Sequence, residues 1–243
     1  MYERFLKRIL DVLLSLAGII VLGIPMLIIS LAIKLGSPGP VFFRQKRFGI
    51  HKSFFNILKF RTMRTDTPKD VPTHMLADPT KWITRTGAFL RKTSLDELPQ
   101  LFNILAGDMS VIGPRPALWN QDDLIAERDK YGANDVKPGL TGWAQINGRD
   151  ELPIPVKAKL DGEYVQRLGF LFDCKCFFGT ITSVGMTAWS RAARASLSGR
   201  RRYETHSHNR HQQLSRQVLQ ALHRGLPRLR DGVHQHARRL VAR

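Results

Sequence analysis

The feature that most constrains this chain is a long uncharged segment close to its N-terminus. From Val12 to Ile33, 22 consecutive residues carry no charge, and most of them are Leu, Ile or Val. As a single α-helix the segment would be about 33 Å long, enough to cross a hydrocarbon core of roughly 30 Å. It is too long for a removable signal sequence and lacks a small-residue cleavage site. The sequence therefore predicts an N-terminal membrane segment.

Two details favour a helix that enters the membrane and returns to the same side. Gly23 and Pro25 lie in the middle of the segment, and an internal Pro removes a backbone hydrogen bond and kinks a helix. Lys and Arg near membrane ends favour the cytoplasmic side, and here both flanks are basic. We therefore expect a re-entrant helix hairpin kinked at Pro25. A kinked single span is the alternative, because Pro is tolerated in such helices. The basic flanking residues are Arg4, Lys7, Arg8, Lys34, Arg44, Lys46 and Arg47.

The rest of the chain predicts an α+β fold that is predominantly helical. Two apolar, aromatic-rich runs around Gly49 predict a short β-hairpin over residues 41–63. A helix is expected to begin near Asp96, with Pro99 in its first turn and the acidic residues at its positive end. The glycine-rich stretch 137–149 predicts a loop. Further helices are expected at 83–92, 119–131 and 155–184, and a loop at 64–80.

The net charge of +18 indicates an anionic partner: nucleic acid, lipid headgroups or phosphorylated substrates. The charge is uneven along the chain. Residues 190–243 contain 13 Arg, no Lys and two acidic residues, so they carry more than half of the excess. We expect three parts: a membrane segment (1–36), a domain on the cytosolic face (37–185) and an Arg/His-rich tail (186–243).

Three interpretations of the tail stay open. It is a disordered extension, a basic arm for anionic lipid or nucleic acid, or the product of a reading-frame error. GC-rich codons chosen for residues 186–196 encode an acidic, glycine-rich end when they are read one base earlier. Sequencing the gene tests this last interpretation.

The adjacent acids Asp96 and Glu97 are the strongest candidates for chemistry. Neighbouring residues on a helix point about 100° apart, so one carboxylate can attack a phosphorus while the other helps to hold Mg²⁺. A carboxylate that attacks a polyanion needs cations around it. An isolated pair of acidic residues, however, most often lies at the solvent-exposed start of a helix. From residue spacing alone, the sequence therefore predicts no more than a membrane-associated protein that binds anions. The candidate phosphate-binding cations are Lys59, Arg61, Arg91, Arg115, Lys137 and Arg149.

Several motifs together resemble the bacterial sugar transferases known as monotopic polyprenyl-phosphate phosphoglycosyl transferases. The resemblance covers roughly residues 1–184 and follows the family's order. The motifs are Lys7-Arg8-x-x-Asp11, the Pro-broken segment, Lys59-Phe60-Arg61-Thr62-Met63, Ser94-Leu95-Asp96-Glu97-Leu98-Pro99-Gln100, Gly107-Asp108-Met109-Ser110, Gly113-Pro114-Arg115-Pro116 and Lys137-Pro138-Gly139-Leu140-Thr141-Gly142.

The resemblance implies a two-step phosphoglycosyl transfer. Asp96 would be the nucleophile that takes the phospho-sugar from a nucleotide sugar, such as a UDP-sugar, and Glu97 would assist Mg²⁺ binding or proton transfer. The acceptor would be polyprenyl (undecaprenyl) phosphate, in the first membrane step of exopolysaccharide, capsule or lipopolysaccharide synthesis. Lys137 occupies a position at which relatives often have Arg. The positive charge is kept, but the planar guanidinium group, which can bind a phosphate through two hydrogen bonds, is lost.

The resemblance also implies where the protein acts and which partners it has. It implies a re-entrant hairpin with interfacial amphipathic helices, at the cytoplasmic face of the bacterial inner membrane. Membrane lipids are expected partners and nucleic acid is not. Two alternatives stay open: a non-enzymatic, membrane-tethered basic protein that binds nucleic acid or anionic lipid, and an inactive relative that keeps the motifs.

Overall fold

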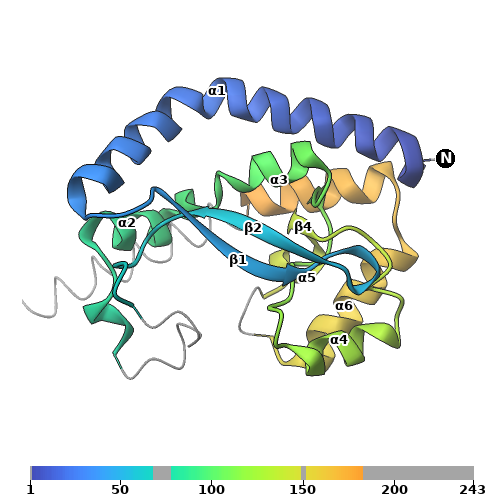
Figure 1. The fold of residues 1–243 in the computed structure, drawn as a ribbon. Helices are drawn as coiled ribbons and strands as arrows, with labels where there is room; N and C mark the ends of the chain where they lie inside the picture. Colours follow the sequence, from blue (N-terminus) through green and yellow to red (C-terminus); the bar gives the residue numbers. More distant parts are fainter. Residues whose placement is uncertain (1, 68–77, 149–151, 183–243) are drawn as a thin grey trace, which may run out of the picture. The chain divides into compact units, whose positions relative to one another are not determined.

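The computed structural model describes residues 2–67, 78–148 and 152–182. Contacts group Met1–Ser183 into one compact unit. The predicted tail, most of the predicted loop at 64–80 and the candidate Arg149 lie outside the described residues. The described elements combine helices with short strands, an α+β fold with one long apolar helix at its N-terminus (Figure 1).

The predicted membrane segment is one long helix, α1 (Lys7–Gly36), which follows a π-helical turn at Tyr2–Leu6. Its 30 residues correspond to about 45 Å. Figure 1 shows α1 as a continuous arch, and Pro25 lies inside it without ending it. The helix stops where Ser37 becomes extended, ahead of the Pro38-Gly39-Pro40 sequence. Among the described residues α1 is the one helix that is long and apolar enough to cross a bilayer.

The two aromatic-rich runs form an antiparallel β-hairpin. Strand β1 (Phe42–Phe48) pairs with β2 (Phe54–Phe60), with Phe42 opposite Phe60 and Phe48 opposite Phe54. A 3₁₀ turn at Ile50–Lys52 connects them. Lys59 therefore lies one residue from the end of β2, on the strand face opposite to that of the buried Phe60.

Two helices follow the hairpin. Helix α2 (Arg85–Thr93) begins where the Thr84 hydroxyl accepts a hydrogen bond from the Gly87 amide, and it confirms the predicted helix over 83–92. A 3₁₀ turn, Leu95–Glu97, and α3 (Gln100–Ala106) come next. The acidic pair thus precedes the helix that was expected to contain it, because α3 begins only after Pro99.

The glycine-rich stretch contains more regular structure than its composition predicts. Strand β4 (Gly139–Thr141) lies parallel to β3 (Ser110–Ile112), and the short helix α5 (Trp143–Ile146) follows. A side chain at Gly139 would clash with the backbone of Gly113, so the two chain segments approach closely only because both positions are Gly.

The predicted helices near 119–131 and 155–184 are confirmed. They are α4 (Asp122–Asp129), α6 (Ile154–Gln166) and a further helix over residues 170–182.

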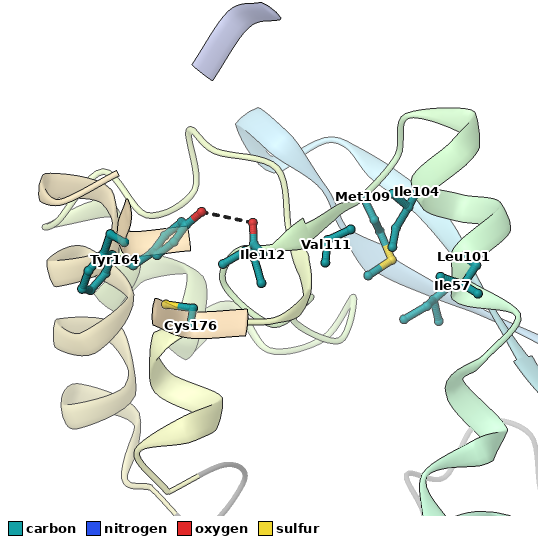
Figure 2. Close-up of a cluster of buried hydrophobic side chains, with 9 residues drawn as sticks. Ile57, Leu101, Ile104, Met109, Val111, Ile112, Tyr164 and Cys176 are labelled. Carbon is teal, nitrogen blue, oxygen red and sulfur yellow. Dashed lines mark hydrogen bonds between the residues drawn. The ribbon is translucent and has the colours of Figure 1, made fainter. Parts of the chain in front are cut away.

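The largest hydrophobic cluster joins β2, α3, β3, α6 and the helix at 170–182 (Figure 2). Tyr164 is buried in it, and its hydroxyl donates a hydrogen bond of 3.1 Å to the Ile112 carbonyl. This contact ties α6 to the end of β3, just ahead of the Gly113-Pro114-Arg115 segment. The cluster consists of Ile57, Leu101, Ile104, Met109, Val111, Ile112, Tyr164, Phe172 and Cys176.

Candidate active site

The turn that carries Asp96 and Glu97 is set by a backbone reversal at Ser94. Ser94 ends α2 in the left-handed region, at φ 59°, and its amide donates to the Leu90 carbonyl. A residue other than Gly occupies this region at some cost, so the surrounding structure must hold the turn in place. Leu95 and Leu98 supply this support by packing against the buried cluster of Met26, Ile33, Phe60 and Leu90. The two leucines face inward, which leaves the acids between them facing the cations of neighbouring elements.

Glu97 is held by two cations from different parts of the chain. Its Oε1 lies 2.8 Å from Lys59 Nζ, on β2, and 2.8 Å from Arg115 Nη2, in the loop after β3. Arg115 Nη1 also lies 3.5 Å from Oε2. Burial alone would raise the pKa of Glu97, but the charges of Arg115 and Lys59 outweigh it and lower the pKa to about 2. Glu97 is therefore a fixed anion at neutral pH.

Asp96 has the opposite electrostatic environment. Burial raises the pKa of its carboxyl group; Lys59 and Arg91 oppose this increase, and the charge of Glu97 adds to it. No side chain among the described residues donates a hydrogen bond to the Asp96 carboxylate. The adjacent carboxylates thus differ: Glu97 is neutralised by two contacts, whereas Asp96 keeps its oxygens available.

Arg91 completes this group from α2. Its Nε donates a 2.8 Å hydrogen bond to Thr62 Oγ1, which orients the guanidinium group. Burial lowers the pKa of Arg91, and the nearby Asp96 charge opposes the decrease. The structure therefore brings together five of the predicted site residues: Lys59, Arg91, Asp96, Glu97 and Arg115.

Two predicted phosphate-binding residues lie elsewhere in the described structure. Arg61 is buried and holds the segment after α1: its Nη2 donates to the Ser37 carbonyl at 2.8 Å, and its Nη1 donates to the Pro38 carbonyl. Lys137 lies beside Gly107, at the C-terminal end of α3, whereas Asp96 and Glu97 precede its N-terminal end. That both residues bind substrate phosphate stays a prediction.

A buried ion pair behind Arg115 was not among the predicted site residues. Arg128 Nη2 donates to the Arg115 carbonyl at 3.0 Å, and the same guanidinium group pairs with Asp161. The pair lies on α4 and α6, 33 residues apart, so no local spacing in the sequence could have revealed it.

The carboxylate pair also offers ligands for a divalent cation. Mg²⁺ is usually bound by one or two carboxylates together with substrate phosphates and water. Asp96 and the Oε2 atom of Glu97 suit this donor set, because both 2.8 Å contacts of Glu97 are made by Oε1, whereas Oε2 has only the longer 3.5 Å contact with Arg115 Nη1. Within the described residues, no group of three or more His, Cys, Asp or Glu side chains is placed to hold a metal ion by itself. Substrate phosphates and water would have to supply the remaining ligands of such an ion.

Comparison with known proteins agrees with the motifs. The family model described as bacterial sugar transferase matches residues 2–187. The chain is 39% identical over 179 residues to the uncharacterized sugar transferase EpsL of Bacillus subtilis (strain 168), covering 74% of this chain and 87% of that protein.

Several relatives have names that state an activity. The UDP-glucose:undecaprenyl-phosphate glucose-1-phosphate transferase of Caulobacter vibrioides is 42% identical over 188 residues, which cover 73% of this chain and 69% of the relative. The protein of the same name in Escherichia coli (strain K12) is 38% identical over 192 residues, or 74% of this chain and 40% of the relative. This chain therefore spans less than half of the Escherichia coli protein. From the family match and these identities, the chain belongs to the bacterial sugar transferase family.

Proposed function

We propose that the protein transfers a sugar 1-phosphate from a nucleotide sugar to a polyprenyl phosphate, through an acyl phosphate in which the phospho-sugar is bonded to the Asp96 carboxylate. The observation that carries this proposal is the inequality of the two carboxylates. Glu97 is neutralised by Lys59 and Arg115, whereas Asp96 has a raised pKa and no described side chain donating to it. A carboxylate that is less stabilised as an anion is the better nucleophile.

In the first step an Asp96 oxygen attacks the phosphorus that carries the sugar. A bond forms between this oxygen and the phosphorus, and the bond from the phosphorus to the bridging oxygen of the diphosphate breaks. The nucleoside monophosphate leaves with the bridging oxygen. Arg91 and Arg115 flank the carboxylates, and their guanidinium groups suit the phosphate oxygens on which charge accumulates.

In the second step the acceptor phosphate attacks the same phosphorus. Its oxygen forms the new bond, the bond between the Asp96 oxygen and the phosphorus breaks, and the carboxylate is regenerated while the sugar remains on a polyprenyl diphosphate. A Mg²⁺ ion held by Asp96 and Glu97 would reduce the charge repulsion between the carboxylate and the substrate. The names of the Caulobacter and Escherichia relatives support UDP-glucose as one donor and undecaprenyl phosphate as the acceptor.

The packing of α1 supports a helix that does not pass through the bilayer. Near its start, Lys7 Nζ lies 2.9 Å from the Ile112 carbonyl oxygen and 2.6 Å from Asp173 Oδ2. Near its end, Ile33 is buried in the cluster that contains Phe60. Both ends therefore contact the same body, which a helix with its ends on opposite sides of a membrane cannot do. We infer a re-entrant or interfacial α1, with the body on the cytoplasmic face of the inner membrane, where nucleotide sugars are found.

Exposed apolar side chains mark the surface that would enter the lipid. On α1, seven large apolar residues are each at least 60% exposed, an arrangement that water does not favour. The helix at 170–182 adds a second set, as an interfacial amphipathic helix would. The residues are Ile20, Val21, Ile24, Leu27, Ile28, Leu31 and Leu35 on α1, and Phe170, Leu171, Phe177, Phe178 and Ile181 on the second helix.

Trapping the intermediate tests this mechanism. The purified full-length protein is incubated with Mg²⁺ and a panel of UDP-sugars in the absence of acceptor. We expect release of UMP and a mass increase of one sugar phosphate on the peptide that contains Asp96. Asp96→Asn should abolish both signals, whereas Asp66→Asn, at an exposed aspartate that pairs with Arg64, should retain them. Product formation without any adduct on Asp96 would overturn the covalent route, and no turnover with any donor would indicate an inactive relative.

A further inference from the structure

A second group of cations lies away from the carboxylate pair, at the C-terminal end of α3. Arg8 donates from Nη1 to the Ile104 carbonyl at 2.6 Å and from Nη2 to the Leu105 carbonyl at 2.9 Å. It thereby gives a partner to the Leu105 carbonyl at the helix end, and it adds a second donor to the Ile104 carbonyl, which also accepts from the Gly107 amide. A guanidinium group has five N–H donors, and these two contacts leave three of them for a further ligand.

Lys137 converges on the same place from the loop before β4. The point where a Cβ of Gly107 would lie is 3.4 Å from Arg8 Nη2 and 3.7 Å from Lys137 Nζ. The two nitrogens are therefore within about 7 Å of each other, a span that one phosphate group can bridge with an oxygen on each side. Gly107 has a φ of 98°, so a residue with a side chain, which would fill this space, is disfavoured here.

The environment of Lys137 is short of negative charge. Burial and then the charge of Arg8 lower the pKa of Lys137, and Asp11 and Asp108 only partly oppose them. Asp11 Oδ1 is already occupied by the Ser110 hydroxyl and the Val111 amide. Within the described part of the chain, Lys137 donates no hydrogen bond. Two neighbouring cations with so little negative charge around them favour the binding of an anion from outside the protein.

The position of Arg8 on α1 indicates where that anion would come from. Lys7 and Asp11 on one side of the helix are buried against the body, while Phe5 and Ile9 are 67% and 54% exposed. Arg8 lies between these two faces and is half-buried. If the exposed apolar face of α1 lies in lipid, Arg8 lies at the level of the headgroups, where phosphate groups are abundant.

We propose that Arg8 and Lys137 form a second anion site, separate from the carboxylate pair, which binds the phosphate group of a membrane lipid. Helix α3 separates the two sites by its length, about 10 Å for seven residues. The shared chemistry is a phosphate ester on a lipid chain. Its source is either a bulk phospholipid or the polyprenyl phosphate acceptor, and the experiment distinguishes the two.

The test uses the full-length protein in non-ionic detergent and native mass spectrometry. The protein is titrated with dioctanoyl phosphatidylglycerol, with dioctanoyl phosphatidylcholine as the zwitterionic reference. We expect one phosphatidylglycerol to bind in preference, with Lys137→Gln weakening it at least fivefold. Lys130→Gln removes the same charge from an exposed lysine on the surface and should have no effect. Asp108→Asn removes a nearby negative charge and should tighten binding, which gives a second test should Lys137→Gln fail to fold.

Competition with farnesyl phosphate identifies the source, and because it measures binding alone it does not depend on the proposed transfer reaction. Displacement of phosphatidylglycerol in the wild type and in Asp96→Asn would assign the site to the acceptor lipid, and lack of displacement would assign it to bulk phospholipid. The proposal is overturned if neither phosphatidylglycerol nor farnesyl phosphate binds. It is also overturned if each of these two lipids binds to the Lys137→Gln variant as tightly as to the Lys130→Gln variant.

Discussion

Arg128 donates from both Nε and Nη2 to a single oxygen of Asp161, at 2.8 and 2.6 Å, and the pair is almost completely buried. Burying two charges has a desolvation cost that such a pair often fails to recover. The same Nη2 also holds the Arg115 carbonyl. The pair thus fixes the backbone of a residue whose side chain contacts Glu97.

Replacing this ion pair should separate stability from activity. Asp161→Leu alone leaves the Arg128 charge buried and should cost about 3–5 kcal/mol of unfolding free energy. Arg128→Met combined with Asp161→Leu should recover most of that loss, because buried pairs are often replaced by apolar residues at little cost. UMP release by the double variant should still fall about tenfold, since Arg115 loses its backbone contact. Thermal unfolding and UMP assays measure the two effects, and full activity in a stable double variant would contradict the role assigned to the pair.

Asp96→Asn should remove activity without lowering stability. Burial and the neighbouring Glu97 raise the pKa of Asp96, so the folded protein disfavours its ionised form. The neutral amide avoids this cost, and we expect an unchanged or higher unfolding temperature. UMP release should fall by more than about 10³-fold, as for loss of a nucleophile. A variant that unfolds at a clearly lower temperature would show instead that the Asp96 carboxylate supports the fold.

The acid side of the pH–activity profile should respond to Arg91. An Asp96 nucleophile must be ionised, so UMP release should fall as the pH decreases through its raised pKa. The Arg91 charge lowers this pKa, and Arg91→Gln should therefore move the acid limb to higher pH. Arg85→Gln removes an exposed charge from the same helix and should leave the limb in place. Profiles of kcat/KM for the three proteins make the comparison, and identical acid limbs would argue against Asp96 as the titrating group.

Glu97 should contribute to stability in a defined pH range. Its pKa is about 2 in the folded protein, below the 4.5 of an unperturbed Glu. The stabilisation from its ion pairs is thus fully present above about pH 4.5 and is lost as the pH falls toward 2, on the order of 3 kcal/mol in all. Glu97→Gln should reduce stability at pH 7 and flatten its dependence on pH below 4.5. Urea or thermal unfolding at several pH values tests this, with Glu127→Gln, at a surface glutamate, as the control.

Features that depend on nearby residues were predictable from the sequence. The apolar segment gave a helix, and the aromatic runs around Gly49 gave paired strands. In each case a short pattern determines the outcome, since burial of alternating or continuous apolar residues needs little tertiary context. Membership of the bacterial sugar transferase family also identifies the chain as an enzyme and rules out the alternative interpretation, a non-enzymatic basic protein.

Features that depend on distant contacts were not predictable. The 3₁₀ turn at Leu95–Glu97 requires Ser94 in a left-handed conformation, which the packing of its neighbours enforces. Strand β4 exists because it pairs with β3, which lies almost thirty residues earlier in the chain. Arg61 and Lys137 are cationic in the sequence whatever they contact, so only the fold could show that they lie outside the carboxylate group.

Because both ends of α1 pack against the body of the protein, the membrane segment and the domain that contains the acidic pair cannot be separated. Cutting the chain at Gly36 to obtain a water-soluble enzyme would strip Met26 and Ile33 from the cluster that supports the acidic turn. It would also leave Asp173 without its ammonium partner. Such a fragment would lose the shape of its reactive centre along with its hold on lipid.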